Sequence, residues 1–343
     1  MLPNLKRIRP EETRIVGAAF FTLFGAMTGH LLMETARDAL FLASIPPSRL
    51  PWVYLGVAIT ALVLVRTQRA VLRQARGGGW LVGSLIGGAA VTFAFWLGLS
   101  PSAVAGLYAL YVWSGVLVTV LVVQFWSLLG DLFTVQQAKR LYPFMGAGAV
   151  LGALTGAGFA NVIAQASADR NLLLAAAITF ALAAIPARMM PTVPQESQEP
   201  LPHDDTREER HLWSLFRGRP YVRHVAALVV VSAMTLTVVD FLFKSAVVDT
   251  IPAERLGAFF ALVYFVLNAL ALLVQFAFVG PMMRRLGVTS SLLALPVLLV
   301  LGSVGLLVSG GIGAAIALKA ADGVLRHSIN RSASELLYVP MPD

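Results

Sequence analysis

Apolar residues fall in long blocks along this chain, separated by short polar segments. Blocks of about 20 residues are long enough to cross a hydrocarbon core of about 30 Å as helices. The sequence therefore predicts an all-α polytopic membrane protein with ten transmembrane helices, at residues 15–43, 51–65, 80–98, 104–129, 141–164, 171–187, 221–249, 257–280, 289–308 and 312–330.

Charged residues interrupt the first apolar block. His30, Glu34 and Asp38 are spaced i, i+4 and i+8, and Arg37 lies one helical turn beyond Glu34, so all four share one broad face. Each charge placed at mid-bilayer costs about 2.5 to 3.5 kcal/mol on insertion scales. This face is therefore expected to point into the helix bundle, toward partners of opposite charge.

The arrangement recurs 206 positions later in the chain. Asp240 stands where Glu34 stands, Lys244 stands where Asp38 stands, and the hexapeptide IPAERL from Ile251 repeats IPPSRL from Ile45. The sequence thus predicts two pseudo-repeated helical bundles.

A long polar stretch rich in proline and charge separates the two repeats and is typical of a flexible linker. We expect a six-helix bundle at residues 1–190, a cytoplasmic linker at 191–220 and an incomplete four-helix bundle at 221–343. Parallel repeats of six helices joined by a long loop are the architecture of the major facilitator superfamily.

The repeat also bears on the C-terminal segment. SASELLYVPM from Ser332 aligns with AKRLYPFM from Ala138 when Tyr338 is set on Tyr142, and the first half continues for two further helices after this point. By this alignment the last two of twelve helices are missing from the sequence. A ten-helix fold complete in itself is the alternative.

Composition and charge agree with the membrane assignment. Hydrophobic residues make up 57% of the chain and charged residues 13%, whereas soluble domains have about 45 to 50% and 25%. With the N-terminus in the cytoplasm, twenty of the 26 Lys and Arg residues lie on cytoplasmic segments and only Arg49, Arg170 and Arg255 lie in outer loops. Arg66, Arg69, Arg73 and Arg76 are expected in one such cytoplasmic loop, as an anchor to anionic lipid. The net charge of +8 thus follows from topology, and no nucleic-acid partner is expected.

The charged residues of three helices provide the candidate chemistry. A cavity between these helices would bring together four cations, Arg37, Lys244, Lys319 and Arg326, and four acids, Glu34, Asp38, Asp240 and Asp322. One interpretation is that they form internal ion pairs that hold or gate the two halves. The other is an anion site, in which the cations bind phosphate or carboxylate and the acids form switching pairs. His30 and Glu34 are also candidates for a proton path, although His30 alone fits a packed polar residue equally well.

Other chemistries find no support in the sequence. Gly148, Gly152 and Gly156 lie four residues apart in a glycine-rich run that lacks the GK[ST] ending of a phosphate loop, so they predict close helix packing. There are no cysteines, and the five histidines form no metal-binding motif. We expect no enzyme active site, no metal and no cofactor.

Four stretches resemble the nucleotide transporter family, which includes the ATP/ADP antiporters of plastids and obligate intracellular bacteria. The most specific is QFWSLLGDLFTVQQAKRLYPFMGAGAVLGALTGAG at residues 124–158; the others are ARDALFL from Ala36, VVDFLFKSAV from Val238 and RHSINRSASELLYVPMPD from Arg326. The resemblance implies a major-facilitator-type exchanger or importer of ATP, ADP or a related phosphorylated compound, in a bacterial inner membrane.

The resemblance also implies roles for individual residues. Arg37, Asp240, Lys244 and Arg326 fall on the family's charged positions and keep their charge sign. Ser114 or a neighbour stands where the family has an acid in the fourth helix, which is a departure from the pattern. Two alternative functions stay open: a sensor or scaffold of transporter fold that signals through a C-terminal soluble domain, and a proton-coupled carrier of another organic anion.

Overall fold

Helices form all regular elements in the part of the chain that the computed structural model describes, namely residues 9–10, 12–74, 78–100, 103–191, 220–277, 299–305, 308 and 311–325. The first half contains α1 (Thr13–Ser44), α2 (Leu50–Gln74), α3 (Gly78–Gly98), α4 (Val104–Leu132), α5 (Val135–Ala166) and α6 (Asn171–Arg188). The second half contains α8 (Pro220–Thr250), α9 (Leu256–Ala277) and α11 (Ile312–Leu325).

Eight of these helices are long and apolar enough to cross a membrane. Large apolar side chains such as Trp52, Leu182 and Val231 are exposed on their outer faces, as expected for surfaces that contact lipid. The expected all-α polytopic membrane architecture is confirmed. Most of the predicted span at 289–308 lies outside the described residues, and so does most of the linker predicted at 191–220.

One boundary differs from expectation. The second helix does not end at residue 65 but continues to Gln74, so Arg66, Arg69 and Arg73 lie on helical backbone rather than in a loop. Arginine and glutamine are good helix formers, so a helix can continue past the apolar segment into the polar region at its end. Hydropathy alone marks where the apolar segment ends, which is not where the helix ends.

The repeat read from the sequence is reproduced in the backbone. Helix α1 ends at Ser44 and α8 at Thr250, and each is followed by a 3-10 turn, Pro47–Arg49 and Ala253–Arg255 respectively. The next helices then begin at Leu50 and Leu256. Every one of these boundaries is 206 positions from its counterpart. We refer to the end of the molecule that carries both turns as the paired-turn end.

The glycine stripe of α5 sets the distance between α5 and α1. A Cβ atom added to Gly148, Gly152 or Gly156 would collide with the backbone carbonyl oxygens of Phe20, Phe24 and Thr28, respectively. Both sets of residues advance in steps of four, so the two helices run parallel in a fixed register. The Thr28 hydroxyl donates a hydrogen bond of 3.0 Å to the Gly152 carbonyl across this contact. The prediction that these glycines serve helix packing is confirmed.

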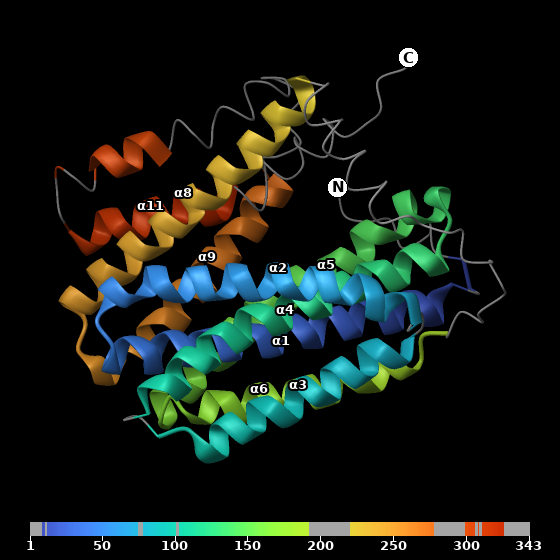
Figure 1. The fold of residues 1–343 in the computed structure, drawn as a ribbon, viewed down its shortest axis with the longest axis horizontal. Coiled ribbons are helices and arrows are strands. Elements are labelled where there is room, and N and C mark those ends of the chain that lie inside the picture. The colour runs from blue at the N-terminus through green and yellow to red at the C-terminus, as the bar shows by residue number, and fades with distance from the viewer. Residues whose placement is uncertain are drawn as a thin grey trace.

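Contacts between the two halves include both turns of the paired-turn end. Helix α1 packs against α4, α5 and α6 within the first half, while α9 packs against α1 and α5. The turn that precedes α9 contacts α1, and the equivalent turn before α2 contacts α8. From this end α8 diverges from α2 toward the opposite end of the molecule (Figure 1).

Candidate functional site

Acidic and basic side chains alternate across the boundary between the two halves. Six residues, which we call the interface network, contribute: Glu34, Arg37 and Asp38 from α1, Asp240 and Lys244 from α8, and Lys319 from α11. The ion pairs in order are Glu34 to Arg37 at 3.0 Å, Arg37 to Asp38 at 3.2 Å, Asp38 to Lys244 at 3.0 Å, Lys244 to Asp240 at 2.8 Å and Asp240 to Lys319 at 2.6 Å. The structure thus brings together six of the eight charged residues singled out from the sequence.

Lys244 occupies the centre of the interface network. Its side chain is only 1% exposed, and its Nζ contacts Asp38 Oδ1, Asp240 Oδ2 and the Tyr111 hydroxyl at 3.0, 2.8 and 2.7 Å. The Asp38 carboxylate is fully buried. Buried charges of this kind are tolerated because each is paired and hydrogen-bonded.

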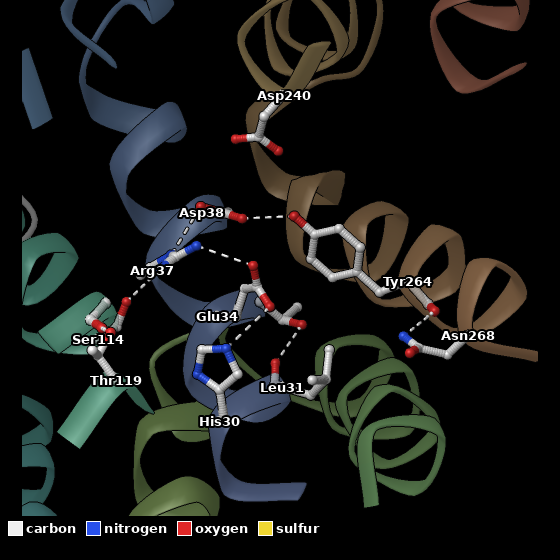
Figure 2. Close-up of polar contacts among 12 residues, drawn as sticks. His30, Leu31, Glu34, Arg37, Asp38, Ser114, Thr119, Asp240, Tyr264 and Asn268 are labelled. Atoms are coloured by element: carbon white, nitrogen blue, oxygen red, sulfur yellow. Dashed lines mark hydrogen bonds and ion pairs between the residues drawn. The ribbon is translucent and has the colours of Figure 1, made fainter. Parts of the chain in front are cut away.

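Three tyrosines complete the network, and the sequence analysis did not identify them. The Tyr264 hydroxyl donates to Asp38 Oδ2 at 2.7 Å, as Figure 2 shows, and the Tyr54 hydroxyl donates to Asp240 Oδ2 at 2.6 Å. Tyr264 and Asp38 come from different halves, and so do Tyr54 and Asp240. The Tyr111 ring lies 4.4 Å from Arg37 Cζ, a cation–π distance, while its hydroxyl accepts from Lys244.

Arg37 and Glu34 form the edge of the network within the first half (Figure 2). Arg37 Nη1 donates to the Ser114 hydroxyl at 2.5 Å, so Ser114, which with its neighbours lies where the family resemblance implies an acid, is a direct partner of the arginine. Glu34 uses one carboxylate oxygen for Arg37, and its other oxygen lies 3.7 Å from His30 Nε2. His30 is therefore next to the network but makes only a long contact with it.

The remaining two predicted site residues are not among these six. Asp322 is fully buried on α11, one turn beyond Lys319, and makes none of the network ion pairs given above. Arg326 lies outside the described residues. Among the residues that the structure does describe, no group of three or more His, Asp or Glu side chains could hold a metal ion.

The interface network lies near the paired-turn end. Asp38 precedes the end of α1 by six residues, and Lys244 precedes the end of α8 by six, which corresponds to about 9 Å of helix in each case. The same ion pair is about 38 Å of helix from the start of α1. The polar contacts of the interface network thus join the two halves near one end of the molecule.

A second contact between the halves lies at the same end. Asp169, in the turn between α5 and α6, accepts a hydrogen bond from the backbone N–H of Gly257 in the first turn of α9. Its carboxylate occupies the space that a Cβ atom at residue 257 would need, so only glycine fits there. Burial raises the pKa of Asp169, and the Gly257 N–H offsets part of that rise. The neighbouring Arg170 fixes the turn by donating to the carbonyls of Trp96 and Leu97.

A separate polar cluster stands at the opposite end of the molecule. Glu12 forms an ion pair of 2.5 Å with Arg140 and accepts from Gln137 and from the backbone N–H of Arg9. Burial alone would raise the pKa of Glu12, but the Arg9 N–H and the Arg140 guanidinium together hold that pKa below its ordinary value. All four residues belong to the first half, so this cluster does not join the halves.

Comparisons with known proteins identify the architecture. No protein-family model matches the chain, and no curated protein matches its sequence. Among solved structures, a mutant form of the nucleoside transporter NupG matches with a TM-score of 0.65 at 12% identity, covering 94% of this chain and 82% of that one. The D-xylose–proton symporter matches with a TM-score of 0.56 at 14% identity, covering 95% and 82%. The chain has a major-facilitator-type fold.

The fold assignment relates the interface network to the boundary between the two halves. In a major-facilitator-type protein, the boundary between the two halves is where substrate binds and where the halves move against each other. The network residues of α1, α8 and α11 lie on that boundary.

Proposed function

We propose that this protein carries a nucleotide, ATP, ADP or a related phosphorylated compound, across a bacterial inner membrane by alternating access. One observation supports this above others: three largely buried cations from both halves, Arg37, Lys244 and Lys319, converge on one site at the boundary. Guanidinium and ammonium groups are the usual ligands of phosphate oxygens. The resemblance of the charged stretches to nucleotide transporters gives the substrate class.

The acids of the network explain how the protein can alternate between two conformations. With the substrate absent, Glu34, Asp38 and Asp240 hold the cations, and the Asp38 to Lys244 pair joins the two halves at the paired-turn end. A phosphate group competes for the same cations and weakens the bonds between the halves. A ligand that binds the two conformations with different affinity in this way shifts their equilibrium.

Topology relates this mechanism to the two sides of the membrane. With the N-terminus in the cytoplasm, as the distribution of basic residues favours, the paired-turn end faces outward. The conformation described here is then closed on the outside, and the divergence of α8 from α2 is at the cytoplasmic side (Figure 1).

The test is counterflow of labelled ATP and ADP into liposomes that contain the protein. With equal pH on both sides, accumulation of label should require unlabelled nucleotide inside, and it should be lost in Arg37→Ala and Lys244→Ala. Arg188→Ala is the matched control, because this arginine is exposed at the end of α6, away from the boundary, and its loss should leave uptake intact. Folded protein that shows no counterflow with any nucleotide would overturn the proposal.

A further inference from the structure

The charges of the interface network cancel. Three acids face three cations, and their side chains are between 0 and 26% exposed. An anion that binds among these cations adds negative charge to a region where unpaired charge costs several kcal/mol per ion. Some compensating positive charge is therefore needed when a phosphorylated substrate is bound.

Glu34 is the acid with the fewest cationic partners, so it is the one left unpaired when Arg37 binds a substrate. Asp38 contacts both Arg37 and Lys244, and Asp240 contacts both Lys244 and Lys319. Within the described residues Glu34 has one Lys or Arg partner, Arg37. Its side chain is also the most exposed of the three acids, at 26%, so water can reach it most readily.

His30 stands on the other side of the same carboxylate. Glu34 directs Oε1 to Arg37 and Oε2 toward His30 Nε2, as seen in Figure 2. The Nδ1 atom of His30 is buried and has no hydrogen-bond partner among the residues that the structure describes. Histidine in general changes charge near neutral pH, and this imidazole lies 3.7 Å from the carboxylate.

The charged and titratable groups around Glu34 come from four helices. His30, Arg37 and Asp38 are on its own helix, Tyr111 comes from α4, Asp240 and Lys244 come from α8, and Tyr264 comes from α9. None of the groups from the other helices forms an ion pair or hydrogen bond with Glu34 in the described contacts. Its polar side-chain contacts among the described residues are thus with Arg37 and His30.

We propose that Glu34, with His30 beside it, binds a proton whenever Arg37 binds the anionic group of the substrate, so that each anion crosses with a proton. The proton passes from hydronium to a carboxylate oxygen of Glu34, so that one O–H bond breaks in hydronium and one O–H bond forms on Glu34. It comes from the water on the side where the substrate enters, and it leaves when Arg37 returns to Glu34. This inference rests on the proposed function and adds the proton as a second cargo.

The experiment separates the two proposals. Liposomes that contain the protein, with the membrane potential clamped to zero, are given labelled ADP under two conditions. The first is counterflow at equal pH on both sides, which tests nucleotide transport alone. The second is uptake into liposomes without internal nucleotide, under an inward proton gradient, which tests coupling.

With one proton per anion, ADP should accumulate about tenfold above its outside concentration for each pH unit of the gradient. In Glu34→Gln the ratio of uptake with the gradient to uptake without it should fall to about one. That ratio is taken within one protein, so a lower overall rate does not affect it. Glu254→Gln, an exposed acid in the turn before α9, should accumulate ADP like the wild type.

Two results would overturn the coupling while leaving transport intact. One is wild-type counterflow without any accumulation under the gradient. The other is accumulation that persists in Glu34→Gln. Absence of counterflow at equal pH would instead refute the proposed function, and the coupling with it.

Discussion

Replacing Lys244 by alanine should weaken the closure of the paired-turn end. The side chain is 1% exposed and is bonded to Asp38 of the opposite half, to Asp240 and to Tyr111. Removing one member of a buried ion pair costs about 3 to 5 kcal/mol, because the remaining charge stays buried without its partner.

For Lys244→Ala, the structure indicates a free-energy cost near the lower limit of that range, because both acids keep other partners. Asp38 keeps Arg37 and Tyr264, and Asp240 keeps Lys319 and Tyr54. A loss of about 3 kcal/mol in the closed state corresponds to a shift of about a hundredfold toward the state open at this end.

The chain contains no cysteine, which makes the measurement direct. Cysteines introduced at the exposed Ser48 and Glu254, one in each turn of the paired-turn end, would carry the only spin labels. Pulsed electron paramagnetic resonance should show one distance between the two labels in the otherwise unaltered chain. After Lys244→Ala it should show a second, longer distance between them. Exchanging both charges for neutral groups, as in Asp38→Asn with Lys244→Met, should restore much of the closed population. A Lys244→Ala protein with an unchanged distance distribution would show that this ion pair does not hold the halves together.

Three further outcomes are expected. Gly152→Ala should lower the free energy of unfolding by about 1 to 3 kcal/mol, because the new Cβ would collide with the backbone of α1. Thermal unfolding in detergent measures this loss. Gly130→Ala is the control and should be neutral, because open space surrounds Gly130. Gly257→Ala should displace Asp169 and lengthen the distance between the labelled turns, and an unchanged distance would contradict the role of this contact. Because the pKa of Glu12 is lowered on folding, its contribution to stability is complete above its unfolded pKa of about 4.3 and is lost as the pH falls through the folded value. A pH titration of thermal stability should show this loss in the wild type and not in Glu12→Gln.

The parts of the structure that the sequence predicted are those with a strong energetic constraint. A charge such as Asp38 within an apolar span must have a partner, and the repeat pointed to Lys244 as a charged position in the second half. Glycines spaced four apart, such as Gly152, predicted close packing because few other causes put such a stripe in an apolar helix. These predictions need no knowledge of the tertiary structure.

The parts that the sequence did not predict depend on contacts between distant segments. Tyr54, Tyr111 and Tyr264 are ordinary residues for a membrane helix, and only the folded bundle directs their hydroxyls to Asp240, Lys244 and Asp38. The sequence drew attention only to Ser114 or a neighbour, as a departure from the family's acid in the fourth helix, and Tyr111 lies one helical turn before Ser114. Likewise, nothing near Asp169 in the chain indicates a bond to Gly257. The division into segments 1–190, 191–220 and 221–343 stays a prediction.

Asp38 and Lys244 are equivalent positions in the two repeats, and yet they contact each other. A residue that contacts its own equivalent must lie on the pseudo-twofold axis that relates the repeats. In a symmetric dimer of identical halves, such a position would set aspartate against aspartate or lysine against lysine, because both copies carry the same residue. An attractive pair on the axis requires that the two halves be encoded separately. The central bond of this protein is thus one that a single chain with two divergent repeats can form and a homodimer cannot.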